Sequence, residues 1–132
     1  MHPTMNAIDI LVTDVQAAID FYRRLGLAFE IDARMPGHAG CDLPNGLHLM
    51  LDTVESRSEF TQEWQTPAGS PRSFLAFELP SPAEVDAKYE ELVEAGHRGL
   101  TKPWDAYWGM RYATVADPDG NGVDLYATLP SN

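Results

Sequence analysis

The sequence predicts an α+β fold made of two βαβββ modules. Three observations predict it: an internal repeat, short apolar runs that alternate with polar residues, and two amphipathic segments that each stop at a glycine. The apolar strand at 7–12 returns at 74–79, which is 67 residues later, and the turn and strand at 45–49 return at 121–125, which is 76 residues later. The second copy is therefore expected to have gained nine residues between its helix and its last strand.

The first module begins with a short apolar strand at 7–12. Asp14 offers an N-cap, and apolar residues recur at helical spacing from Val15 to Leu25 before Gly26 ends the helix. Strands are then expected at 27–33, 39–43 and 47–51, with a break at Pro36-Gly37 and a hairpin turn at 44–46.

The second module repeats this order with clearer boundaries. Ser81-Pro82-Ala83-Glu84 is a capping box with proline at the first helical position, and the helix is expected to stop near Gly96. Strands are expected at 97–102, 110–116 and 122–127, with a dense turn signal at 117–121.

We expect residues 1–132 to form a single domain, because either half alone would bury too little surface. Module one covers about 6–52 and module two about 73–128, with a polar connector at about 53–72 between them. The connector holds Phe60 and Trp64. A connector this long in a small domain is more often a lid or a partner-binding segment than slack chain.

Composition excludes several function classes. The net charge of −11 argues against a nucleic-acid partner, because phosphates need a basic face, and no apolar run approaches the roughly 20 residues of a membrane span. Either solubility or a cationic partner accounts for the acidity, and charge alone favours solubility. The single cysteine, Cys41, cannot form an internal disulfide and is expected to be buried and inert. With no signal-peptide pattern at the start, a cytoplasmic location is expected.

Two motifs carry a family resemblance. Val12-Thr13-Asp14 leading to Phe21-Tyr22-Arg23-Arg24-Leu25-Gly26, and Asp117-Pro118-Asp119-Gly120-Asn121 before the final strand, resemble the vicinal oxygen chelate superfamily. That group includes glyoxalase I, extradiol dioxygenases, fosfomycin-resistance enzymes and the antibiotic-binding bleomycin-resistance proteins. The resemblance spans about residues 6 to 128. It implies paired βαβββ modules whose sheets curl around a cleft, and a homodimer.

The resemblance also implies four metal-ligand positions on the first and last strands of the modules. They fall on Ala7, His48, Phe74 and Asp124, and the repeat pairs Ala7 with Phe74 and His48 with Asp124. Alanine and phenylalanine cannot coordinate a metal, and a catalytic site usually needs at least three protein ligands. We therefore expect no metal and no other cofactor, with His48 and Asp124 as weak candidate ligands.

Strand alternation gives a set of residues expected to face the cleft, joined by an aromatic run at 104–112. The predicted ligand-binding residues are Asp9, His48, Met50, Phe74, Glu78, Trp104, Trp108, Arg111, Asp124 and Tyr126. The aromatic run fits a core or a dimer interface as well as it fits a stacking platform. Aromatic rings beside unpaired carboxylates suit a flat cationic ligand.

Three hypotheses remain open from the sequence. The favoured one is a metal-free binding protein of the bleomycin-resistance type that sequesters a planar cationic ligand and catalyses no reaction. The alternative is a glyoxalase-like lyase or a dioxygenase with a divergent metal site that uses His48 and Asp124. The third is metal-free catalysis with His48 as a general base oriented by Asp124.

Overall fold

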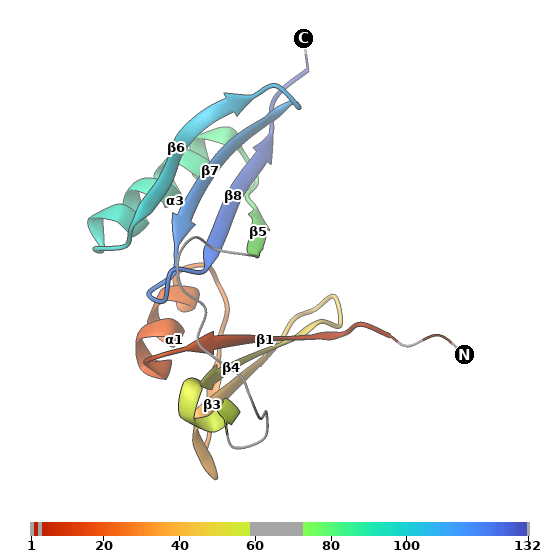
Figure 1. Cartoon of the computed structure of the whole chain (residues 1–132). Coiled ribbons are helices and arrows are strands. Elements are labelled where there is room, and N and C mark those ends of the chain that lie inside the picture. Colours follow the sequence, from red (N-terminus) through yellow and green to blue (C-terminus); the bar gives the residue numbers. More distant parts are fainter. Residues whose placement is uncertain (1, 3, 59–72, 132) are drawn as a thin grey trace. The chain divides into compact units, whose positions relative to one another are not determined.

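The computed structural model describes residue 2, residues 4–58 and residues 73–131. By its contacts the chain divides into two compact units, Met1–Ala68 and Gly69–Asn132, and each carries one four-stranded sheet. Strands and helices follow one another as βαβββ in both units (Figure 1), so the predicted α+β class and its two modules are confirmed. Phe60 and Trp64 lie outside the described residues.

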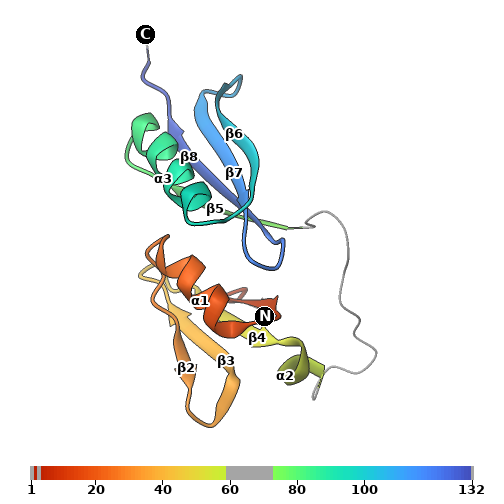
Figure 2. The same ribbon diagram turned by 90° about the vertical axis from the view of Figure 1, so that its left-hand side faces the viewer.

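The first unit has its four strands in the order β1-β4-β3-β2. Its elements are β1 Ala7–Val12, α1 Val15–Arg23, β2 Glu30–Asp32, β3 Met35–Asp42, β4 His48–Thr53 and α2 Val54–Ser58. Strand β1 runs parallel to β4, and the other pairs are antiparallel. The short helix α2 follows β4 directly (Figure 2).

Helix α1 begins where the sequence predicted a cap. The Asp14 side chain accepts hydrogen bonds from the backbone N–H groups of Gln16 and Ala17, and Gly26 follows the helix at a φ of +88°. One helix face buries Tyr22 and Ile19 against the sheet. Alternate sheet residues complete this core, namely Ile10, Val12, Ala39, Cys41, Leu49 and Leu51. Cys41 is buried, as predicted.

The second unit repeats the strand order as β5-β8-β7-β6, with β5 parallel to β8. Its elements are β5 Phe74–Glu78, α3 Pro82–Glu94, β6 Gly99–Ala106, β7 Met110–Ala116 and β8 Gly122–Thr128. The Ser81 hydroxyl accepts from the Glu84 N–H, which confirms the predicted cap. Helix α3 lies across one face of this sheet (Figure 1), where Val85 and Leu92 are fully buried with Leu125.

Three elements differ from the prediction for physical reasons. Strand β2 keeps only three of the seven expected residues, because its register with β3 breaks after Ile31. Strand β3 starts at Met35 and so includes Pro36; its pairing with β4 begins only at His38, so the missing proline N–H removes no bond from that ladder. Helix α2 was not predicted, because five residues without a strong apolar period give little signal.

The structure corrects the second part of the repeat. Gly46 and Gly120 both turn at positive φ, and each donates its N–H to the carbonyl three residues earlier. These two glycines are 74 residues apart, so the insertion is seven residues and not nine. The sequence comparison matched the wrong glycines, because the second turn reads Gly-Asn-Gly. As a result Gly122, and not Asp124, is the counterpart of His48.

The turn between β7 and β8 depends on Asp117, which is 4% exposed. Its carboxylate accepts from the N–H groups of Asp119 and Asn121 and from the Asn121 side chain, at 2.8 to 2.9 Å. Replacing it by alanine leaves these buried donors without their acceptor. Asp117→Ala should lower the free energy of unfolding by about 1–3 kcal/mol in urea titrations. Glu90→Ala on the exposed side of α3 is the control, and equal losses in both variants would contradict this role.

Candidate functional site

The face of the second sheet opposite α3 carries a row of aromatic side chains, and we call it the aromatic face. Residues that lie opposite one another on paired strands point to the same side of a sheet. The register therefore places Trp104 beside Tyr112, and Tyr112 beside Tyr126. Trp108 joins them from the β6–β7 turn. This face holds six of the ten predicted residues: Phe74, Glu78, Trp104, Trp108, Asp124 and Tyr126.

The rings of the aromatic face touch one another in series. Tyr112 and Tyr126 stack at 5.9 Å between ring centroids, and Trp108 meets Tyr112 edge-on at 5.4 Å. Trp104 contacts Trp108 at 5.5 Å. Trp104 and Trp108 are 40% and 46% exposed. Large exposed apolar surface of this kind often marks a binding site.

Asp124 lies within this row, and two hydroxyl groups hold its carboxylate. Tyr112 donates to Oδ2 at 2.9 Å and Thr114 donates to Oδ1 at 2.8 Å. Burial, and then the hydrogen bond to Asp124, raise the pKa of Tyr112 to about 12. The phenol therefore remains a donor at neutral pH. Glu78 adds a second, exposed carboxyl group on the same face, opposite Tyr126.

Phe74 fills one of the positions that the resemblance assigns to a metal ligand. Its ring lies over Gly122, the residue opposite it on β8, and a Cβ at that position would collide with the ring. The glycine at 122 is therefore required by Phe74. In this corner of the second unit, an apolar ring occupies the space where two ligands would need to meet.

Arg111 does not share a face with the other predicted residues. Its guanidinium makes two hydrogen bonds to Asp86 of α3, at 2.9 and 3.1 Å, and a third to Asp105. It therefore belongs to the helix-covered side of the sheet, whereas its neighbour Tyr112 belongs to the aromatic face. The strand alternation of residues 110–112 already separates the two, and grouping the whole aromatic run as one surface ignored it.

The face of the first sheet opposite α1 is rich in carboxylates, and we call it the acidic face. The remaining predicted residues, Asp9, His48 and Met50, lie on it, because the register places Asp9 beside Met50 on neighbouring strands. The ring of His48 leans over Gly40, and its Nδ1 lies 2.7 Å from the carboxylate of Asp42.

A second histidine–carboxylate pair lies deeper on the acidic face. His38 Nδ1 lies 2.8 Å from Oδ1 of Asp52, whose side chain is only 3% exposed. Asp9 is close to this pair, and Arg57 of α2 donates to Asp9 Oδ2 at 3.1 Å. Burial, then a hydrogen bond and charge repulsion with Asp52, raise the pKa of Asp9 from 3.8 to about 7, although Arg57 and His38 oppose the shift.

The sequence reading missed this deeper pair. Asp52 was placed just past its strand, which in fact runs to Thr53, and His38 fell in an expected break. The period of two along β4 from His48 would have placed Asp52 on the same face. Only the pairing of β3 with β4 brings His38 opposite Asp52.

The acidic and aromatic faces do not fit the metal site that the resemblance implies. Among neighbouring pairs on the paired strands, Ala7 faces His48 and Ala76 faces Asp124, so each pair has one donor side chain at most. Both Asp124 oxygens already accept hydroxyl protons. Across the described ranges, no group of three or more His, Cys, Asp or Glu side chains is placed to hold a metal ion.

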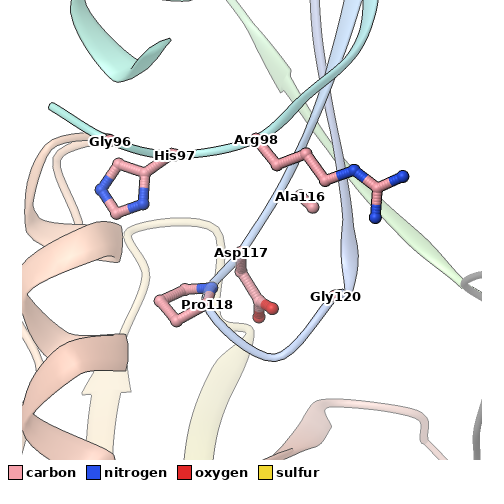
Figure 3. A pocket seen from close by; sticks show the side chains of 7 residues that line it. All are labelled: Gly96, His97, Arg98, Ala116, Asp117, Pro118 and Gly120. Atoms are coloured by element: carbon pink, nitrogen blue, oxygen red, sulfur yellow. The ribbon is translucent and has the colours of Figure 1, made fainter. Parts of the chain in front are cut away.

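A small pocket lies in the second unit between the end of α3 and the β7–β8 turn (Figure 3). Its volume is about 260 Å³, and it is bordered by His97, Arg98 and Asp117 among others. Pockets for small-molecule ligands usually measure about 300–1,000 Å³. Because Asp117 is engaged in holding the turn, we assign this pocket to the fold and not to a ligand.

Known proteins match both the sequence and the structure of this chain. Residues 4–125 match the profile of the Glyoxalase/Bleomycin resistance protein/Dioxygenase superfamily. The chain belongs to this superfamily. Uncharacterized proteins of Mycobacterium bovis and Mycobacterium tuberculosis are each 32% identical to it over 120 residues, which is 88% of this chain and 78% and 69% of theirs.

Solved structures of the superfamily agree with this assignment. A glyoxalase/bleomycin resistance protein/dioxygenase from Nocardioides is 27% identical, with a TM-score of 0.78 over 100% of this chain and 87% of that one. A family enzyme from Burkholderia phytofirmans has a TM-score of 0.84 over 96% and 100% of the two chains, but at 21% identity it supports the fold alone. In the described part of the chain, no helix is long and apolar enough to cross a membrane.

Asp9 should make the stability of the protein depend on pH. With its pKa raised to about 7, the folded state holds a proton between about pH 4 and pH 7 that the unfolded state has released. Asp9 therefore favours the fold at pH 5, and this contribution is lost as the pH rises through about 7. The stability of wild type relative to Asp9→Asn should fall by on the order of 1–3 kcal/mol between pH 5 and pH 8 in urea titrations. A constant difference would contradict it.

Proposed function

We propose that this chain is a metal-free small-molecule binding protein, which sequesters a planar organic cation on its aromatic face. One observation carries the proposal: a contiguous row of rings surrounds Asp124, a carboxylate fixed by two hydroxyl donors. Such a surface needs no catalytic group to act. This role resembles that of the bleomycin-resistance branch of the superfamily.

The rings supply attraction that does not depend on ligand identity. Stacking a flat ring on an aromatic side chain contributes about 1–3 kcal/mol, and a cation over a ring adds about 0.5–2 kcal/mol. Trp104 and Trp108 are accessible enough to take such contacts. Two or three of them would reach micromolar affinity, which corresponds to about −8 kcal/mol.

The carboxyl groups favour a cation over an anion. Asp124 and Glu78 lie on the aromatic face, and no basic side chain joins them there, because Arg111 is held by Asp86 on the other side of the sheet. The net charge of −11 adds a long-range preference of the same sign.

The metal-enzyme alternative is weaker on the same geometry. Phe74 and Gly122 leave no ligand in one corner, and both oxygens of Asp124 accept hydrogen bonds. His48 is paired with Asp42 and has Ala7 as its neighbour on β1. A divalent ion would meet one or two protein ligands, which is fewer than a catalytic site uses.

Three naphthalene derivatives that differ in charge test this proposal by calorimetry at pH 7 in the presence of EDTA. Naphthylmethylammonium should bind at micromolar to submillimolar concentration, at least about fivefold tighter than naphthylmethanol or naphthoate, which is about 1 kcal/mol. Trp108→Ala should weaken all three ligands. Asp124→Asn should remove most of the preference for the cation.

Glu90→Gln serves as the charge control, because it removes one negative charge from the exposed side of α3 and should leave binding unchanged. Tighter binding of naphthoate would contradict the proposal. So would cation binding that disappears in EDTA and returns with zinc or manganese, since that result would support a metal site.

A further inference from the structure

The acidic face of the first unit contains a histidine that the proposed function does not use. His38 on β3 lies directly opposite Asp52 on β4, and their side chains meet at 2.8 Å. Asp52 is 3% exposed in its side chain, whereas His38 is 23% exposed. A buried carboxylate thus holds a histidine whose ring still reaches the surface.

This contact determines which ring nitrogen is available. When a carboxylate accepts the Nδ1 proton of a histidine, the neutral ring keeps its lone pair on Nε2. Within the part of the chain that the structure describes, no hydrogen-bond partner is found for Nε2 of His38. A histidine oriented in this way by a buried aspartate is suited to accept a proton from a substrate or from water.

Charged groups from two other elements surround the pair. Asp9 of β1 lies beside Asp52, and Arg57 of α2 donates to Asp9 at 3.1 Å. Asp9 Oδ1 is buried, and no donor for it is found among the described residues. The cluster therefore combines a base, carboxyl groups and one guanidinium within a small, largely buried volume.

Helix α2 is positioned closely enough to be part of this cluster. A Cβ at Gly37 of β3 would collide with the side chains of Ser56 and Thr53. The Thr53 hydroxyl also accepts from the Ser56 N–H at 3.2 Å, at the start of the helix. The glycine thus lets α2 pack against β3, which brings Arg57 over the sheet.

We propose that His38, positioned by Asp52, is the general base of a metal-free site on the acidic face that acts on small carbonyl compounds. For an ester, Nε2 takes a proton from water while the water oxygen bonds to the carbonyl carbon. The bond from that carbon to the leaving oxygen then breaks, and the proton on Nε2 passes to solvent. The products are one carboxylic acid and one alcohol, and no oxidant or metal is required. This site is independent of ligand binding on the aromatic face.

Hydrolysis of p-nitrophenyl acetate by the full chain in EDTA tests the proposal. His38→Gln should lower the rate constant at least about tenfold, within the range that general-base catalysis usually contributes. His97→Gln removes a histidine of the second unit and should change the rate less than about twofold. Asp52→Asn should alter the shape of the pH–rate profile, whereas a purely structural role would scale the rate equally at every pH.

A second measurement needs no variant and applies even if His38→Gln fails to fold. Wild-type protein is treated with diethyl pyrocarbonate, and modified histidines are mapped by mass spectrometry while the remaining hydrolysis rate is followed. Loss of activity should track modification of His38. Loss that tracks His48 or His97, or hydrolysis equal in wild type and His38→Gln, would overturn the proposal.

Discussion

The alternation of side chains along β-strands is the constraint on which both units depend. In each sheet one set of alternate residues packs under a helix, so the other set is free to carry chemistry. Leu125 of β8 is fully buried beneath α3, while its neighbours Asp124 and Tyr126 belong to the aromatic face. The same rule separates Leu51, which is fully buried, from Asp52 in β4. A shift of one residue in the register would exchange core and site in either unit.

The two units use one strand plan for different surfaces. In the first unit, His48 stands at the turn-proximal end of β4 and leans over Gly40 towards Asp42. At the corresponding place in the second unit there is Gly122, because Phe74 covers it. This exchange turns a polar corner into an apolar one without any change in topology. It also explains why a superfamily fold can persist here without a complete set of metal-binding side chains.

The sequence predicted the architecture well and the site in part. Capping residues such as Asp14 and Ser81, and the glycines that end the helices, act locally, so they reveal the elements directly. Six residues of the aromatic face followed from alternation alone. The pair formed by His38 and Asp52 did not, because it depends on which strands are neighbours and in what register. The position of Arg111 was missed for the opposite reason, since a run rich in aromatic residues was read as one surface although its side chains alternate.

The central claim is that the aromatic face, and not the rest of the chain, receives the ligand. Two-dimensional proton–carbon NMR spectra of the aromatic side chains, recorded during a titration with naphthylmethylammonium, test it most directly. The account predicts upfield ring-current shifts for Trp104, Trp108, Tyr112 and Tyr126 that saturate together, while the buried ring of Tyr22 and the helix-borne Tyr89 keep their positions. Shifts confined to the histidines of the acidic face, or equal shifts at Tyr22 and Tyr89, would contradict it.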